Sequence, residues 1–294
     1  MPVLARNLNK SPTTPKRVIF FGKNGSIAKY LRNNLKKKNI NHKFISSKKI
    51  NLLNSKSSKE ISNIIKREDV IVFISAKAPA KNFDDYIKNI KMAINFCKYC
   101  DENKISQLIY ISSDAVYSDS TKPLTEKSKT NPSNIHGLMH IARENLLKVK
   151  FSKKLLIIRP TLIYGSTDTH NGYGPNLFIR SIKKNKLINI FGKGEELRDH
   201  LYIGDLFNIL ISSIKFKTLG TINISSGKLI SFKKILNDVR KLNKNYNKPI
   251  NYLKRNSPMP HNGYRPISNK LVKKLFAFKF NSLNDVLLKI YMKY

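Results

Sequence analysis

The stretch from Lys16 to Asn39 constrains the fold more than any other part of the sequence. Four consecutive apolar residues, Val18–Phe21, are followed by Gly22 and Gly25 and then by a helical pattern. A short and wholly apolar run is typical of a strand that is buried on both faces of a parallel sheet. Two glycines between a strand and a helix let the backbone turn sharply and bring a helix N-terminus toward a bound pyrophosphate. The stretch therefore predicts a dinucleotide-binding turn.

Strand-like and helix-like segments alternate through the first half of the chain. Further apolar runs lie in "HKFISS", "DVIVFISA", "QLIYISS" and "KLLIIRP", with helical patterns between them. This alternation predicts an α/β fold with a doubly wound parallel sheet of the Rossmann type. Ligands of such sheets bind at the carboxyl ends of the strands. We therefore expect the segments that end at Gly22, Ala76, Ser113 and Pro160 to converge on one crevice.

The second half of the chain has a looser pattern, with loops rich in Gly, Asn and Pro after Gly165 and short helices toward the C-terminus. We interpret it as a smaller, C-terminal substrate-binding lobe that is assembled from separate pieces. The expected division is a flexible polar leader at 1–15, a dinucleotide-binding domain at 16–164 plus 197–226, and a substrate lobe at 165–196 plus 227–294.

A formal net charge of +38 would suit a protein that binds nucleic acid or an anionic membrane surface. The lysines are spread over the whole chain and no aromatic-plus-glycine RNA-binding pattern occurs, so we expect no specific nucleic-acid partner. The longest apolar runs are far shorter than the roughly 20 residues of a membrane span. The N-terminus also lacks the apolar segment of a secretory signal. We therefore expect a cytoplasmic protein without membrane insertion.

Two cysteines, Cys97 and Cys100, lie inside a helical pattern. A C-x-x-C pair can be redox-active or half of a metal site, but no second pair is present to complete a zinc site. We expect two packed helix residues without a disulfide, and no metal.

The motifs, taken in order and at their spacing, resemble the extended short-chain dehydrogenase/reductase family of NAD(P)-dependent nucleotide-sugar epimerases, dehydratases and reductases. They are "GKNGSIA", "ISAKAP", "YISSDAVYS", "PLTEKSKTNPSNIHGLMHIARE", "RPTLIYG", "FGKGEELRDHLYIGDL" and "YRPISNKL". The resemblance extends over nearly the whole chain from Lys16. It implies a nicotinamide cofactor, a nucleotide-sugar substrate, and a homodimer formed through the helices at 84–103 and 136–148.

The resemblance also implies a role for each matched position. The cofactor-binding residues are expected to be Gly22, Asn24, Gly25, Ser26, Ile27, Ser46, Lys48, Asn51, Ala76, Ala78, His140 and Pro160. The residues for the substrate diphosphate are expected to be Asn176, Arg198 and Arg265, since a guanidinium fork pairs with two phosphate oxygens. Ser113 matches the catalytic Ser/Thr that hydrogen-bonds the reacting sugar oxygen, and Asp114 lies beside it.

The chain departs from the family at the end of the second strand. NAD-binding members carry an acidic residue there, whereas this chain has "ISSKK". Ser46, Ser47 and Lys48 can instead bind a 2′-phosphate, which favours NADP over NAD.

The second departure is in the central catalytic motif. The family's Tyr-Gly-x-x-Lys falls on His136-Gly137-Leu138-Met139-His140. A free tyrosine has a pKa near ~10 and needs a neighbouring cation to ionise at neutral pH. An imidazole, with an unperturbed pKa around ~6.5, exchanges a proton there without help. We therefore expect His136 to be the acid/base, and His140, one helical turn later, to support it or to bind the nicotinamide ribose.

The expected activity is hydride transfer at a sugar carbon, as an epimerase or a reductase. Dehydration is the least favoured of the three family reactions, because the family's dehydratases have an Asp-Glu pair where this chain has Asp114 and Ala115. The alternative is a non-catalytic protein of the same fold that binds the cofactor or a nucleotide sugar, its tyrosine and lysine having been lost.

Overall fold

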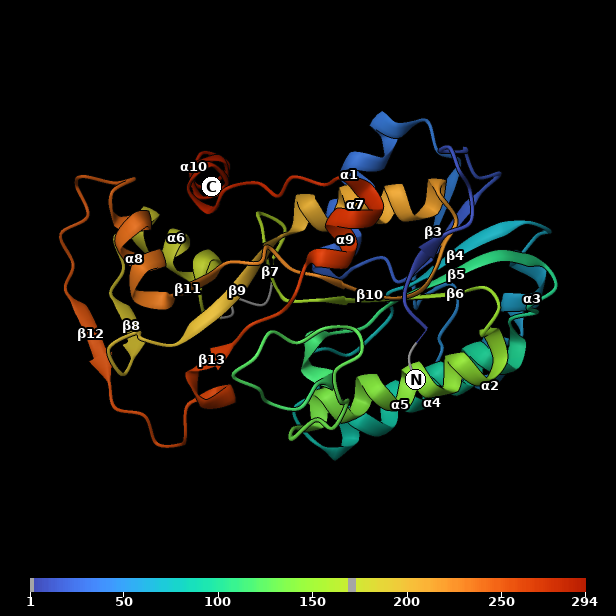
Figure 1. The fold of residues 1–294 in the computed structure, drawn as a ribbon, viewed down its shortest axis with the longest axis horizontal. Helices are drawn as coiled ribbons and strands as arrows, with labels where there is room; N and C mark the ends of the chain where they lie inside the picture. Colours follow the sequence, from blue (N-terminus) through green and yellow to red (C-terminus); the bar gives the residue numbers. More distant parts are fainter. Residues whose placement is uncertain (1–2, 169–172) are drawn as a thin grey trace.

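The structure is a computed structural model and describes residues 3–168 and 173–294. A seven-stranded sheet with the order β1-β10-β6-β5-β4-β2-β3 forms its centre (Figure 1). Neighbouring strands run parallel, except that β1 is antiparallel to β10. This confirms the doubly wound α/β fold. The strands are β1 (Arg6–Asn7), β2 (Val18–Phe21), β3 (His42–Ile45), β4 (Asp69–Phe73), β5 (Ile105–Ile111), β6 (Leu155–Pro160) and β10 (Thr218–Ile224).

Helices cover both faces of this sheet (Figure 1). On one face lie α1 (Ser26–Leu35), α7 (Ile203–Lys215) and α9 (Lys270–Phe276), and on the other α4 (Phe83–Tyr99) and α5 (Ile135–Phe151). Successive side chains of a strand point to opposite faces. Phe20 therefore packs into the core under α1 and α7, and Phe21 into the core under α4 and α5. The short helical segments are η1 (Lys36–Lys38), α2 (Ser55–Ser58), α3 (Glu60–Ile64), η2 (Asp114–Val116) and η3 (Pro260–Gly263).

A smaller lobe lies beside the sheet and has a core of its own, which includes Phe178, Phe232 and Leu287. Its strands are β7 (Leu162–Tyr164), β8 (Ile188–Phe191), β9 (Leu197–Tyr202), β11 (Leu229–Ser231), β12 (Ile250–Leu253) and β13 (Tyr264–Arg265). Its helices are α6 (Pro175–Lys183), α8 (Phe232–Arg240) and α10 (Leu283–Tyr291).

The division between the lobes differs in two places from the one expected. We assigned residues 197–226 to the large domain, but β9 pairs with β7, β11 and β13 in a small sheet. We assigned residues 227–294 to the small lobe, but Val272 of α9 packs into the core of the large sheet. The chain thus crosses between the lobes several times.

We expected residues 1–15 to be a flexible leader, but the described part of this segment packs against the edge of the large sheet. Arg6 and Asn7 pair with Leu219 and Thr218, and Ala5 is only 5% exposed. The Thr13 N–H donates to the Lys215 carbonyl at 2.9 Å. An edge strand is held by main-chain hydrogen bonds, which need no apolar side chains. The polar composition of this segment therefore gave no indication that β1 pairs with β10.

Both cysteine thiols are free. Cys97 lies on α4, and Cys100 follows the last residue of that helix and is buried. Burial raises the pKa of the Cys97 thiol to about 11, so it stays protonated at neutral pH. Within residues 3–168 and 173–294, no helix is long and apolar enough to cross a membrane.

Candidate active site

A cavity of about 520 Å³, called here the cofactor cavity, opens at the carboxyl ends of β2, β3 and β4. The strand order reverses at this point of the sheet, and ligands of doubly wound folds bind at such a switch point. Eight of the predicted cofactor residues line it: Gly22, Asn24, Gly25, Ser26, Ile27, Asn51, Ala76 and Ala78. Ser46 and Lys48 do not line it, and Ser47, between them, does. The Ser46 carbonyl instead accepts from the N–H groups of Lys49 and Ile50 in a tight turn.

The N-terminus of α1 is open toward the cofactor cavity. Gly25 is its N-cap, no side chain caps it, and its first turn holds no acidic residue. A Cβ added to Gly25 would meet nothing within 4 Å, whereas one on Gly22 would lie 3.0 Å from Ile74 Cγ1. Gly22 also has φ +120°, which side-chain-bearing residues rarely adopt. Uncapped N–H groups at a helix N-terminus attract anions, so this turn fits a pyrophosphate.

A second cavity of about 420 Å³, called here the substrate cavity, continues from the first. Ile27, Ile74, Ala76, Ala78 and Ile163 line both cavities. The substrate cavity also receives the predicted residues Ser113, Asp114, His136, His140, Pro160 and Arg198. One residue that the sequence did not single out, His261, lines it as well.

Gly137 explains how α5 brings His136 against the loop after β5. A Cβ at position 137 would lie 2.1 Å from the Ala115 carbonyl oxygen, so only glycine permits this contact. The helix begins at Ile135, and Asn134 caps it by accepting from the Gly137 N–H at 2.9 Å. The start of α5 is therefore fixed beside Ser113 and Asp114.

The two histidines of the motif are in ring contact. Their centroids lie 4.7 Å apart at an interplanar angle of 85°. The Ala80 N–H donates to His136 Nδ1 at 3.4 Å, which is a long hydrogen bond. Burial lowers the pKa of His136, and the Asp114 carboxylate opposes this shift. His136 is therefore neutral at pH 7 and able to accept a proton.

His140 is held differently from His136. Its Nδ1 lies 2.7 Å from the hydroxyl oxygen of Tyr110, and both residues are buried. Burial, followed by the charges of His136 and Arg143, keeps the pKa of His140 well below 6.5. His140 is thus a neutral hydrogen-bonding group and not a substitute for the positive charge of a lysine.

The buried cations of α5 and β6 are part of the scaffold around the site. Arg143 lies over the rings of Phe73 and Tyr110 and donates to the Ser75 carbonyl at 2.7 Å. Arg159 donates to both carboxylate oxygens of Glu144, at 2.9 and 2.6 Å. The ion pair joins α5 to β6 and fixes the helix on which both histidines lie.

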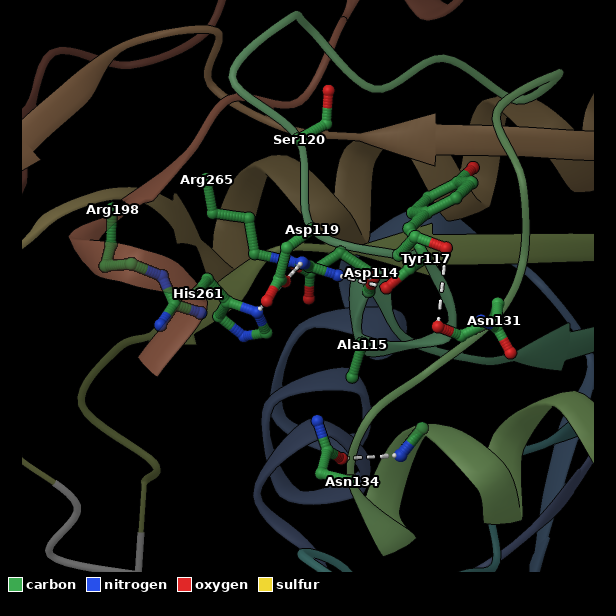
Figure 2. A network of polar contacts seen from close by, with 12 residues as sticks. Asp114, Ala115, Tyr117, Asp119, Ser120, Asn131, Asn134, Arg198, His261 and Arg265 are labelled. Carbon is green, nitrogen blue, oxygen red and sulfur yellow. Dashed lines mark hydrogen bonds and ion pairs between the residues drawn. The ribbon is translucent and has the colours of Figure 1, made fainter. Parts of the chain in front are cut away.

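Arg265 does not line the substrate cavity, although we expected it to bind the substrate diphosphate. Its side chain is 1% exposed and donates to Asp114 Oδ2 at 3.0 Å and to Asp119 Oδ1 at 2.9 Å (Figure 2). Its Nη2 group donates to the carbonyls of Asp114 and Tyr117. Arg265 therefore connects the small lobe to the loop after Ser113 through its ion pairs with Asp114 and Asp119.

The two other predicted substrate residues differ from each other. Arg198 lines the substrate cavity and pairs with Glu196 at 3.0 Å. Asn176 is buried outside the cavity lining, where its amide accepts from the Gly165 N–H and donates to Asp168. Only Arg198 is therefore placed to meet a ligand directly.

No metal-binding group of three or more His, Cys, Asp or Glu side chains occurs in the part of the chain that the structure describes. His200, on β9, is buried against the ring of Phe232, and burial lowers its pKa to about 3. His170 lies outside the described residues.

A Rossmann sheet with a glycine-lined cavity at its switch point defines a dinucleotide-binding class of protein. Within that class, the model of the NAD dependent epimerase/dehydratase family matches residues 18–225. The chain belongs to this family.

Curated relatives include a dTDP-4-dehydro-6-deoxyglucose reductase of Escherichia coli, 29% identical over 209 residues. A UDP-glucuronate 4-epimerase of Thermodesulfobacterium geofontis is 26% identical over 212 residues. These matches span 66% and 68% of this chain, and 66% and 63% of the relatives' own lengths.

Two solved structures share the fold. A GDP-L-fucose synthetase from Naegleria fowleri bound to NADP has a TM-score of 0.81 at 16% identity, with 98% of this chain and 96% of that chain covered. A UDP-glucose 4-epimerase from Thermotoga maritima with UDP-glucose has a TM-score of 0.80 at 17% identity, with 94% and 98% covered.

Proposed function

We propose that the protein is an NAD(P)-dependent epimerase or reductase of nucleotide sugars, with His136 as its acid/base. One observation carries this proposal: His136 lines a cavity that also holds Ser113 and Pro160 and that continues into the cofactor cavity. A proton-transferring group and a hydroxyl thus lie next to the expected nicotinamide position.

A bound nicotinamide cofactor would accept or supply the hydride. His136 takes the proton of the sugar hydroxyl when the sugar is oxidised, and in its protonated form it returns that proton when a keto sugar is reduced. The Ser113 hydroxyl accepts from the Ala115 N–H at 3.1 Å and donates to Asp114 Oδ1 at 3.4 Å, a long bond that it can exchange for one to the sugar oxygen.

His140 orients rather than transfers the proton. Since Tyr110 donates to Nδ1, the proton of the neutral ring resides on Nε2. An Nε2–H group can hydrogen-bond a ribose hydroxyl, as the lysine does in the family that the sequence resembles. Asp114, paired with Arg265, acts through charge because it opposes the lowering of the pKa of His136.

NADP is the cofactor that we propose over NAD. The turn after β3 holds no carboxylate, Ser47 lines the cofactor cavity, and Lys48 and Lys49 follow it. A hydroxyl and nearby ammonium groups suit a 2′-phosphate, which a carboxylate would repel.

Arg198 is the proposed contact to the substrate diphosphate, since it lines the substrate cavity and carries a guanidinium. The relatives that act on dTDP- and UDP-sugars make these the first substrates to test. We also propose a homodimer through α4 and α5, which lie side by side (Figure 1) and expose apolar side chains.

The test follows deuterium from C4-deuterated NADPH or NADH into a panel of dTDP- and UDP-linked keto sugars. Deuterium on a sugar carbon supports the proposal and names the acceptor. Saturable binding of the cofactor without any transfer in either direction would instead favour a non-catalytic binding protein, a reading that the loss of both Tyr and Lys from the motif also permits.

A further inference from the structure

We propose that His261, from the small lobe, contacts the nucleotide sugar through Nε2 and helps to determine which sugar nucleotide is bound. This inference rests on the proposed function. His261 lies in η3 and lines the substrate cavity together with Arg198. It also lines an adjoining surface cavity with Asp119 and Tyr264, so it stands where the substrate cavity meets the outside.

The orientation of the ring is fixed by a carboxylate. His261 Nδ1 lies 2.5 Å from Asp119 Oδ1, and Arg265 Nη1 donates to the same oxygen at 2.9 Å (Figure 2). A carboxylate can only accept, so the proton of the neutral ring is on Nδ1. The 3.0 Å contact between Arg265 Nη1 and His261 Nδ1 then joins two donors and is not a hydrogen bond.

Nε2 consequently keeps its lone pair. Among the described residues, none forms a hydrogen bond with Nε2, and the side chain is 12% exposed. Burial, Arg265 and Arg198 lower the pKa of His261 against the opposing effect of Asp119. At neutral pH the ring is therefore uncharged. Its Nε2 is a hydrogen-bond acceptor, and the contact of Nδ1 with Asp119 fixes its orientation.

The backbone at His261 has an uncommon conformation, which supports a functional role for this residue. His261 and Asn262 have φ of +54° and +51°, and Gly263 follows at +74°. Residues with a Cβ rarely adopt this left-handed conformation, and such conformations cluster at functional sites. Here the conformation accompanies the contact between the His261 ring and Asp119, across 142 residues of sequence.

Arg198 and His261 together indicate which class of ligand the substrate cavity binds. Arg198 offers a cation for a phosphate oxygen, and His261 Nε2 offers an acceptor for a hydroxyl (Figure 2). A ligand that carries a hydroxyl close to a phosphate satisfies both groups, as a nucleoside diphosphate sugar does. An acceptor that the bound ligand covers and leaves without a donor disfavours analogues that lack the hydroxyl.

The experiment observes the histidine rings directly. The chain has six histidines, so ¹³Cε1-histidine labelling gives a short NMR spectrum, in which His261→Gln identifies the signal of His261. NADP-saturated protein is titrated with UDP-glucose and with dTDP-glucose. We expect the His261 signal to move with saturation, and His261→Gln to weaken nucleotide-sugar binding about tenfold with cofactor affinity unchanged. His42→Gln, on the edge strand β3, is the matched control.

The outcomes separate the two proposals. If a nucleotide sugar binds and shifts the His136 signal while the His261 signal stays still, the inference about His261 is wrong and the proposed function stands. If no nucleotide sugar binds at millimolar concentration and none is reduced or epimerised, both are wrong. If His261→Gln does not fold, single substitutions of the other five histidines assign the His261 signal by elimination, and the titration of the unsubstituted protein still decides the matter.

Discussion

Tyr110 and His140 form a buried hydrogen bond of 2.7 Å from the hydroxyl oxygen to Nδ1. Burial raises the pKa of Tyr110, so its hydroxyl keeps its proton, and we infer that it donates this proton to His140 Nδ1, the one partner that it meets among the described residues. The neutral His140 must then carry its own proton on Nε2. A tyrosine on β5 thereby sets the tautomer of a histidine on α5, next to His136.

Replacing Tyr110 with Phe tests this relationship. The change leaves His140 Nδ1 buried without a donor, which is expected to cost about 1–3 kcal/mol of the free energy of unfolding. Both tautomers of His140 then become accessible, so cofactor affinity and turnover should fall together. Urea unfolding and cofactor titration measure the two effects. Tyr99→Phe removes a hydroxyl that is hydrogen-bonded to Ser55 near the surface. This control should change neither the free energy of unfolding nor the cofactor affinity.

The pH dependence of catalysis should follow the lowered pKa of His136. Oxidation of a sugar requires the neutral ring, so its rate rises with pH through a pKa below 6.5 and is flat above about pH 7. Reduction requires the protonated ring, so its rate falls as the pH rises through the same value. Rates of the chemical step between pH 5 and 10 check this. An oxidation rate that is still rising near pH 10 would point to a tyrosine and not to His136.

Cofactor preference should depend on Ser47, which lines the cofactor cavity. Ser47→Asp places a carboxylate at the end of β3, where it repels a 2′-phosphate and accepts from ribose hydroxyls. We expect the ratio of NADP to NAD affinity to drop by about tenfold or more, equivalent to roughly 1.4 kcal/mol. Quenching or enhancement of NAD(P)H fluorescence gives the two dissociation constants. Ser47→Asn, which adds similar bulk without charge, should leave the ratio nearly unchanged, and a ratio insensitive to both changes would refute the assignment.

Self-association should depend on the apolar side chains that α4 and α5 expose. Phe83, Ile87 and Ile94 on α4 are 68%, 45% and 48% exposed, and Leu138 and Val149 on α5 are 46% and 88% exposed. Within each helix these positions are spaced so as to lie on one face. Ile87→Lys with Ile94→Lys should yield a monomer by light scattering. Leu187→Lys, at an exposed apolar residue of the small lobe, should leave the dimer intact.

Local features of the sequence predicted the fold well. The strand β2, the turn at Gly22 and the helix α1 are encoded within a few neighbouring residues, so glycine spacing and apolar runs identify them. The antiparallel edge strand β1 escaped prediction, because its partner Thr218 lies more than 200 residues away and its bonds are main-chain bonds.

The candidate site was predictable where one motif places a residue by itself. His136, His140 and Ser113 do meet in one cavity. Arg265 was assigned to a ligand from the family resemblance. No sequence pattern indicated its ion pair with Asp114, because the two residues lie 151 positions apart. His261 belongs to no motif at all, and only the contact with Asp119 shows how its ring is oriented.

The most direct test of the account is a single-turnover absorbance trace at the reduced-nicotinamide band. Concentrated protein, loaded with NADPH or NADP, is mixed with dTDP-, UDP- and GDP-linked sugars and their 4-keto forms. We expect a change in absorbance with at least one pair of cofactor and sugar, and its loss in His136→Phe, which should still bind the cofactor with nearly unchanged affinity. A trace of full amplitude and rate from His136→Phe would contradict the central claim that this histidine transfers the proton.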